Sequence, residues 1–202
     1  VICDSNPKIP NRTDALLSDE TGPIIEALAQ TALNLEQAGA GIIGIPCNTA
    51  HAFLADVRAA VGVPVLDMIG EAAIRALEIF GEGTTVGLLA TDGTLRSRLY
   101  HDALEGVGLV ALSPSAAGIQ YAVMDALDAV KLHGPSEDAY GALGAAVRNL
   151  ASEGATAVIA ACTEASLVLE RHPPDLPWLD PLQILAEALV REAIGADEGS
   201  EK

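Results

Sequence analysis

Aromatic residues are scarce in this chain of 202 residues, which contains one Trp, three Tyr and two Phe. A folded core must therefore be built from Ala, Leu, Ile and Val, and the sequence argues against binding of single-stranded nucleic acid by aromatic stacking. Hydrophobic residues still make up 50% of the chain, which rules out an intrinsically disordered protein. The length fits one domain or two small lobes.

Basic residues are also few, since 11 Lys and Arg stand against 28 Asp and Glu and the formal net charge is −17. Because such a chain repels phosphate backbones and anionic membranes, we expect no nucleic-acid partner and no membrane partner. An anionic ligand would need local positive groups that override this field. No apolar run approaches the ~18–20 residues of a membrane span, and we expect no signal peptide.

Cysteine occurs only at Cys3, Cys47 and Cys162, too few and too far apart for a disulfide scaffold. An odd number of widely spaced cysteines fits a reducing compartment, so we expect a cytoplasmic protein. Cys3 lies in a strand-like start, and we expect it to be a core residue.

Short apolar runs alternate with amphipathic stretches along most of the chain. The apolar runs predict strands at residues 1–3, 42–46, 63–66, 85–90, 109–112, 157–161 and 178–179. Helical spacing of apolar residues predicts helices at 69–80, 116–131, 137–150 and 182–193. Gly134 suits a helix C-cap, and Asp67 and Asp180 suit N-caps. The alternation predicts an α/β fold with a mostly parallel sheet, in which ligands bind beyond the carboxyl ends of the strands.

Two parts of the chain resemble each other. Residues 38–47 (AGAGIIGIPC) align with 153–162 (EGATAVIAAC), residues 63–67 (VPVLD) align with 176–180 (LPWLD), and a helical pattern follows in both. Ala-rich sequences can match in part by chance, but the coincident cysteines favour a true repeat. It predicts two similar α/β lobes related by pseudo-symmetry, with the active site between them. We expect the first lobe at 1–82, the second at 83–180, and at 181–202 a C-terminal helix that packs back on the first lobe and ends in an acidic tail.

Cys47 and Cys162 each stand where a strand is expected to turn into a helix, followed by small polar residues. Free backbone N–H groups at a helix start can hold a carboxylate, and the same field lowers the pKa of a thiol. Four interpretations are open for each cysteine: a buried core residue, a disulfide partner, a metal ligand or one half of an acid–base pair. Neither flank has the spacing of a zinc site, and the repeat favours the acid–base pair.

The segments around both cysteines resemble the paired signatures of the aspartate/glutamate racemase family, whose members racemise amino acids without pyridoxal phosphate. The matching segments are IPCNTAH at 45–51, ACTEA at 161–165, SNPKIPNRT at 5–13 and ATDGT at 90–94, with Tyr100 after the last. They keep the family's order over nearly the whole chain. Two departures are visible: the family's first strand and Gly-rich loop have no counterpart before Ser5, and Asn11 stands where Asp is common.

The resemblance implies a cofactor-independent racemase acting on a small dicarboxylic amino acid. Cys47 and Cys162 would move the Cα proton between opposite faces. Arg12 would bind the side-chain carboxylate and Lys131 would contact the substrate. Glu164 stands where the cell-wall glutamate racemases usually have His, which favours aspartate over glutamate. The residues implied to bind substrate are Arg12, Asn48, Thr49, Lys131, Thr163 and Glu164.

Several alternatives stay open beside this hypothesis. Arg12 could be an exposed arginine beside a turn, and Lys131 could simply suit the end of a helix. His51 could tune the Cys47 thiol or serve as a cap or core residue. Related proteins isomerise maleate, racemise hydantoins or decarboxylate malonates, and a shortened non-catalytic homologue would only bind small carboxylates. Two-lobed racemases often dimerise, but no exposed stripe identifies an interface, so a homodimer is left open.

Overall fold

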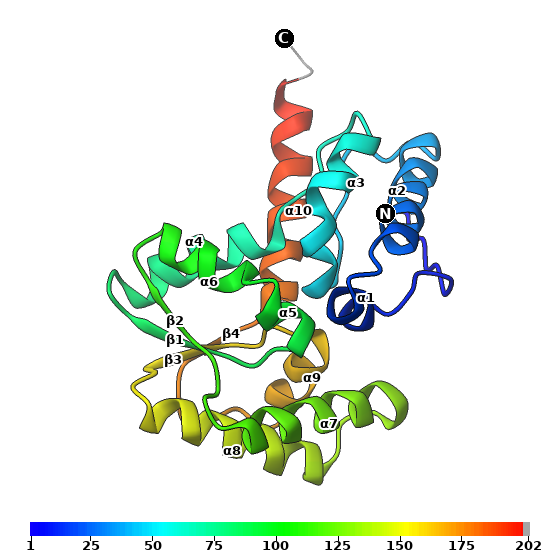
Figure 1. Cartoon of the computed structure of the whole chain (residues 1–202). Helices are drawn as coiled ribbons and strands as arrows, with labels where there is room; N and C mark the ends of the chain where they lie inside the picture. The colour runs from blue at the N-terminus through cyan, green and yellow to red at the C-terminus, as the bar shows by residue number, and fades with distance from the viewer. Residues whose placement is uncertain (200–202) are drawn as a thin grey trace.

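The computed structural model describes residues 1–199 and contains a four-stranded parallel sheet (Figure 1). The strands are β1 (Thr85–Leu88), β2 (Val110–Leu112), β3 (Ala157–Ile159) and β4 (Trp178–Leu179), in the order β2-β1-β3-β4. Parallel pairing requires crossover connections, and helices supply them. The predicted α/β class with a parallel sheet is therefore confirmed.

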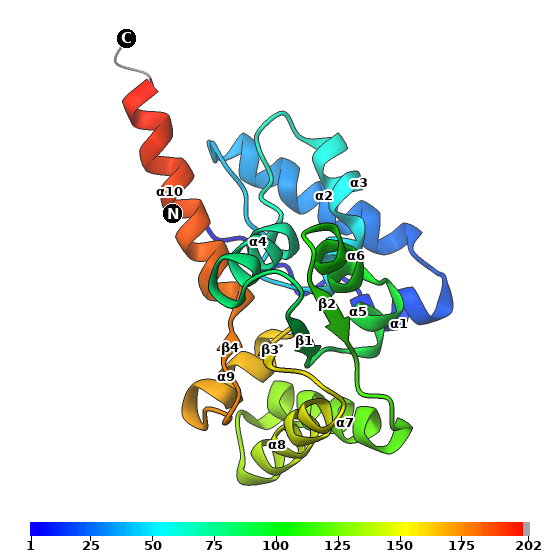
Figure 2. The same cartoon turned by 90° about the vertical axis from the view of Figure 1, so that its left-hand side faces the viewer.

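Helices cover both faces of the sheet (Figures 1 and 2). Successive strand residues point to opposite faces, so one strand contributes apolar side chains to the packing on both sides. Val158 faces α7 (Ala117–His133), α8 (Glu137–Ser152) and α9 (Thr163–Arg171), with which it forms one apolar cluster. Ile159, the next residue, joins a second cluster with α4 (Met68–Phe80) and α6 (Leu99–Gly106). The short helix α5 (Asp92–Arg96) follows β1.

The N-terminal part packs around a third apolar cluster, which includes Ile24, Phe53 and Val57. Its helices are α1 (Arg12–Ser18), α2 (Gly22–Gln37), the 3₁₀ helix η1 (Thr49–Phe53) and α3 (Leu54–Ala60). No strand of the described sheet comes from this part. Instead, Ile43 and Val65 form a single parallel bridge, with the Ile43 N–H donating to the Pro64 carbonyl at 2.9 Å.

Three predicted strands differ from the structure. Residues 1–3 lie exposed without secondary structure, so the strand there and the core position of Cys3 were wrong. Residues 42–46 and 63–66 keep only the single bridge. The physical reason is that Pro46 and Pro64 lack the N–H that a ladder needs, and two short strands without further neighbours are only marginally stable.

The four predicted helices are present as α4, α7, α8 and α10 (Pro181–Gly199). The first three lie within two residues of the expected bounds, whereas α10 extends six residues beyond its expected end at 193. Asp67 caps α4 by accepting hydrogen bonds of 3.0 Å from the Ile69 and Gly70 N–H groups. Asp180 likewise accepts from the Leu182 N–H at 2.9 Å, and Gly134 ends α7 with φ of 80°. All three caps were predicted.

Helix α10 starts at the edge strand β4, packs along α4 and then extends away from the body (Figures 1 and 2). Arg75 and Arg191 join the two helices through ion pairs of 3.0 Å to Glu187 and 2.9 Å to Glu71. The end of the predicted acidic tail, at 200–202, lies outside the described residues. The predicted boundaries between the lobes, after residues 82 and 180, stay predictions. Within 1–199, no helix combines the length and apolar character that a membrane crossing requires.

Candidate active site

A cavity of about 90 Å³ lies where the N-terminal part meets the carboxyl ends of the sheet strands. Both expected cysteines and all six expected substrate-binding residues line it. The complete lining is Asn11, Arg12, Thr13, Pro46, Cys47, Asn48, Thr49, Thr91, Lys131, Cys162, Thr163 and Glu164. Segments separated by more than a hundred residues thus bring their polar side chains into one small space.

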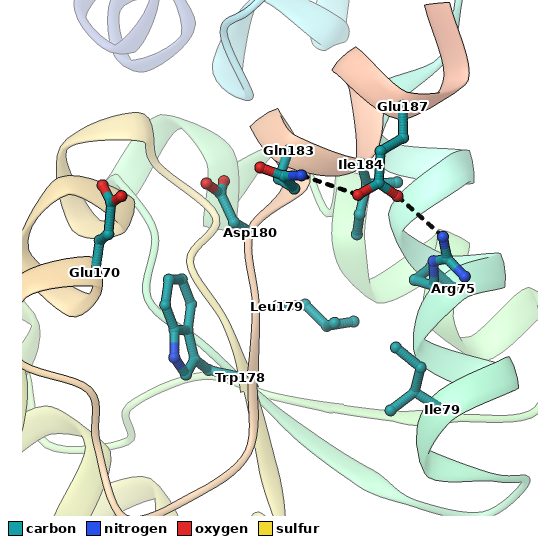
Figure 3. Close-up of a pocket in the computed structure, with 9 residues that line it drawn as sticks. All are labelled: Arg75, Ile79, Glu170, Trp178, Leu179, Asp180, Gln183, Ile184 and Glu187. Atoms are coloured by element: carbon teal, nitrogen blue, oxygen red, sulfur yellow. Dashed lines mark hydrogen bonds and ion pairs between the residues drawn. The ribbon is translucent and has the colours of Figure 1, made fainter. Parts of the chain in front are cut away.

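Two larger hollows lie elsewhere. One, of about 420 Å³, is an open surface groove between α4, β4 and α10 (Figure 3). Three of its polar side chains bind one another, since Gln183 donates to Glu187 and Glu187 pairs with Arg75. The other, of about 340 Å³, is largely apolar and lies between α2 and residues 43–46, with Arg12 and Cys47 on its border. The small cavity is the only one of these three that contains both cysteines.

Cys47 is half-buried just before η1, and His51 fixes its backbone. The Met68 N–H donates to Nε2 of His51 at 3.1 Å, so this nitrogen must be the acceptor. Nδ1 therefore carries the proton and donates to the Cys47 carbonyl at 2.9 Å. Burial lowers the pKa of His51, which keeps the ring neutral. Of the two roles considered for His51, this geometry supports a structural bridge between Cys47 and the start of α4.

Cys162 is buried at the N-cap of α9, three residues after the last residue of β3. Its thiol donates a hydrogen bond of 2.9 Å to Oε2 of Glu164. Burial, together with the negative charge of Glu164, raises the pKa of the Cys162 thiol well above its usual range. The expectation that the helix start would lower the pKa was therefore wrong for Cys162, because burial and a neighbouring carboxylate outweigh the helix dipole.

Asn48 and Thr49 enter the cavity from the start of η1, and buried partners hold both side chains. The Tyr100 hydroxyl donates to Oδ1 of Asn48 at 2.6 Å, which leaves the amide NH₂ as the donor that Asn48 can offer to a ligand. The Thr49 hydroxyl lies 3.1 Å from that of Thr91 and 2.8 Å from that of Thr94, and these two are 3.1 Å apart. The three hydroxyls form a closed, buried network.

Arg12 and Lys131 supply the positive charge of the cavity. Arg12 begins α1, and its Nη1 donates to the Pro10 carbonyl at 3.3 Å, so much of the guanidinium is left for a ligand. Lys131 lies in the last turn of α7 and pairs with Asp128 at 2.9 Å. Burial opposes the charge of Lys131, but the hydrogen bond to Asp128 and nearby negative groups prevail and raise its pKa. Both groups are cationic at neutral pH.

Sequence reasoning missed the threonine network. Thr91 lines the cavity and caps α5 by accepting from the Thr94 N–H at 3.3 Å. A threonine at the end of a strand and directly before a helix is a typical N-cap, and that signal could have identified it. No local pattern could have shown that Thr49, more than forty residues earlier in the N-terminal part, completes the network. Across residues 1–199, no group of three or more His, Cys, Asp or Glu is placed to hold a metal ion.

Comparison with known proteins gives consistent results. Residues 1–189 match the family described as Asp/Glu/Hydantoin racemase. The broad specificity amino-acid racemase RacX of Bacillus subtilis is 28% identical over 165 residues, which span 82% of this chain and 70% of that protein. The structure of Picrophilus torridus aspartate racemase superimposes with a TM-score of 0.79 at 26% identity, covering 93% of this chain and 77% of that one. A glutamate racemase structure from Francisella tularensis shares the fold, with a TM-score of 0.68 at 20% identity, covering 94% and 68% of the two chains.

Proposed function

The chain belongs to the Asp/Glu/hydantoin racemase family and is an isomerase of the racemase class, and from that premise we propose that it interconverts the L and D forms of an acidic amino acid, aspartate in preference to glutamate. Cys47 and Cys162 would transfer the proton at the α-carbon. The observation that carries the proposal is that both thiols line one small cavity together with Arg12 and Lys131.

Racemisation removes the Cα proton from one face of the substrate and returns a proton to the other face. Two acid–base groups on opposite sides do this most directly. In one direction a Cys47 thiolate takes the Cα proton while the Cys162 thiol donates its proton to the opposite face. The return reaction exchanges these roles. The proposal is supported by the origin of the two cysteines, which approach the cavity from the two halves of the internal repeat.

A Cα proton is far less acidic than a thiol, so the developing negative charge on the substrate needs stabilisation. The amide of Asn48 and the N–H groups at the starts of η1 and α9 are the available donors beside the two cysteines. These donors would hold the α-carboxylate. Because they are fixed before substrate binds, little reorganisation is required in the transition state.

An acidic side chain is supported by Arg12 and Lys131, the local positive groups that a chain of net charge −17 needs to attract an anion. A guanidinium can bind a carboxylate through two parallel hydrogen bonds. The small cavity and the likeness to an aspartate racemase support aspartate over glutamate, which is longer by one methylene. The likeness to a broad specificity amino-acid racemase supports a second candidate, a wider range of amino acids.

Other reactions of similar proteins fit the cavity less well. A decarboxylase that works with a single cysteine has no use for a second thiol on the opposite side. A hydantoin lacks the side-chain carboxylate that Arg12 and Lys131 would bind. The experiment below distinguishes a racemase from a non-catalytic protein that only binds small carboxylates.

The test is proton NMR of L-aspartate and L-glutamate incubated with the protein in D₂O under reducing conditions, without added cofactor. We expect the Cα proton signal to decay and chiral analysis to find the D enantiomer. Cys47→Ser and Cys162→Ser should each abolish racemisation, because a serine hydroxyl is far too weak an acid to replace the thiol. Cys3→Ser is the matched control, since Cys3 is exposed and lies outside the cavity. Failure of the wild-type protein to exchange the proton would contradict the proposal, and so would racemisation that survives both substitutions.

A further inference from the structure

The two cysteines of the cavity have unequal surroundings. The Cys162 sulfur lies 2.9 Å from Oε2 of Glu164, and the same oxygen accepts from the Thr163 hydroxyl at 3.1 Å. Among the described residues, no carboxylate is hydrogen-bonded to the Cys47 sulfur. A pair of acid–base groups that is symmetric in sequence is thus asymmetric in its charges.

We propose that Glu164 keeps Cys162 as a neutral thiol in the resting enzyme, so that Cys162 starts the cycle as proton donor and Cys47 starts it as base. This inference rests on the proposed racemase function for its catalytic meaning. Glu164 is a positioning residue here, because it acts on the substrate through the Cys162 proton. The sequence repeat alone assigns the two cysteines equal roles.

The direction of the hydrogen bond follows from the chemistry of the two groups. An ionised carboxylate has no proton and can only accept, so the proton of the short S–O contact belongs to the sulfur. A Cys162 thiolate would place two negative charges 2.9 Å apart in a buried site, where repulsion is weakly screened. The Thr163 hydroxyl stabilises the ionised carboxylate, since it donates to the same Oε2 atom.

The other charged groups near Cys162 do not reverse this balance. Lys131, on α7, and the backbone N–H of Glu164 favour the Cys162 thiolate, but each effect is smaller than that of burial or of the Glu164 carboxylate. Tyr100, on α6, is completely buried, and its raised pKa keeps the phenol neutral. The thiol at Cys162 is therefore the favoured form before substrate enters.

In one turnover, each bond to hydrogen that breaks is matched by one that forms. The Cα–H bond breaks as the Cys47 S–H bond forms, and the Cys162 S–H bond breaks as the new Cα–H bond forms on the other face. The product complex holds a Cys47 thiol and a Cys162 thiolate beside Glu164. This form either converts the opposite enantiomer or returns to the resting form by proton exchange with water. The resting enzyme is thus set for the enantiomer whose Cα proton faces Cys47.

The experiment measures each thiol directly by pH titration of the NMR signals of cysteine labelled with ¹³C at Cβ. Single Cys→Ser variants assign the signals. In the wild-type protein we expect Cys47 to ionise at lower pH than Cys162. In Glu164→Gln, which keeps the size of the side chain and removes its charge, the Cys162 midpoint should fall by about one pH unit or more. Glu164→Asp retains the charge and should leave Cys162 closer to the wild-type midpoint.

Glu170→Gln is the matched control, because Glu170 is an exposed carboxylate on the same helix and lies outside the cavity. It should leave the Cys162 midpoint unchanged. An equal midpoint for Cys162 in the wild type and Glu164→Gln would overturn the inference, and so would a Cys47 midpoint above that of Cys162. The titration needs no substrate, so a protein that shows the shift but no racemisation would contradict only the proposed function.

Discussion

The hydroxyl of Tyr100 donates a hydrogen bond of 2.6 Å to the side-chain oxygen of Asn48. Tyr100 comes from α6, after the central strand β1, whereas Asn48 precedes η1 in the N-terminal part. The tyrosine is completely buried, and burial together with nearby acidic groups raises its pKa, so the hydroxyl keeps its proton. This contact sets the orientation of the Asn48 amide and joins the N-terminal part to α6, which packs on the sheet.

Tyr100→Phe should therefore affect both stability and substrate binding. The substitution leaves a buried amide oxygen without its donor, which costs about 1–3 kcal/mol in the free energy of unfolding. With the amide free to rotate, KM should rise by about fivefold, the equivalent of about 1 kcal/mol, with a smaller change in kcat. Urea unfolding and steady-state kinetics measure the two effects. Tyr121→Phe alters an exposed side chain, 75% accessible on α7, and should change neither; an unchanged KM in Tyr100→Phe would contradict the role given to Asn48.

His51 should make the protein less stable in mild acid. Burial lowers its pKa in the folded protein below the ordinary 6.5, so between the two values the unfolded chain binds a proton that the folded protein excludes. The free energy of unfolding must then fall as pH drops below about 6.5, by at most about 1.4 kcal/mol per pH unit, and this loss ends once pH reaches the folded pKa. The bridge between Cys47 and Met68 also breaks on protonation, because Nε2 can no longer accept.

Urea unfolding at a series of pH values tests this, with His51→Gln as the variant that cannot titrate. Its stability should depend less on pH below 6.5, and the remaining slope includes His101, whose pKa burial also lowers. His133→Gln replaces an exposed histidine at the end of α7 and should retain the wild-type slope. Equal slopes in the wild type and His51→Gln would rule out a neutral, buried His51.

The site was largely predictable because its chemistry depends on short segments whose positions the fold type sets. In a parallel sheet, residues that follow different strands meet at one edge, which is why Cys162 and Glu164, after β3, share a cavity with Thr91, after β1. For Cys47, the repeat supplied the matching position. All eight predicted residues line this cavity, and their roles in the reaction stay predictions.

What escaped prediction depends on contacts between distant segments. The strands expected at 42–46 and 63–66 have the right apolar pattern, yet their ladder contracts to one bridge because no further strand of the described chain pairs with them. Burial of the Cys162 thiol, together with the neighbouring Glu164 carboxylate, reverses the pKa shift that a helix start alone suggests. Side-chain orientation within a turn and pairing across lobes are properties of tertiary packing, which no local pattern contains.

Gly93 lies where α5 packs against the start of α1. A Cβ atom at this position would lie 2.8 Å from the backbone Cα of Thr13 and 3.1 Å from Cγ2 of Thr49. Because backbone cannot step aside as a flexible side chain can, Gly93→Ala should destabilise the protein by about 1–3 kcal/mol and displace the start of α1, where Arg12 lies. We expect lower activity as well as a lower melting temperature.

Gly141→Ala is a control that should change stability in the opposite direction. Gly141 lies inside α8, and a Cβ there would meet nothing within 4 Å. Alanine favours the helix over glycine by up to about 1 kcal/mol, so the variant should be more stable than the wild type and equally active. Thermal unfolding of both variants decides the matter. A Gly93→Ala protein as stable as the wild type would show that α1 and α5 are less tightly packed than the structure indicates.

We expect Arg12 to make the enzyme prefer a substrate with a side-chain carboxylate over one with a side-chain amide. Arg12→Gln should lower kcat/KM for L-aspartate by about 100-fold, because it removes a charge-assisted, two-point contact. Arg12→Lys keeps the charge but lacks the planar fork, so it should lie between the two. Stability should change by no more than about 0.5 kcal/mol, since within residues 1–199 the only hydrogen bond of the guanidinium is the 3.3 Å contact to the Pro10 carbonyl.

L-Asparagine is the matched substrate, because it has the shape of aspartate without the side-chain charge. If Arg12 binds the side chain, Arg12→Gln should scarcely alter the already slow reaction of L-asparagine, and the preference for aspartate should disappear. If Arg12 binds the α-carboxylate instead, which both substrates carry, the two reactions should slow by the same factor. Enantiomer-resolved assays of the two substrates with wild type and Arg12→Gln therefore assign the carboxylate that Arg12 contacts. Equal loss for both would leave Lys131 as the cavity's remaining cation for the side chain.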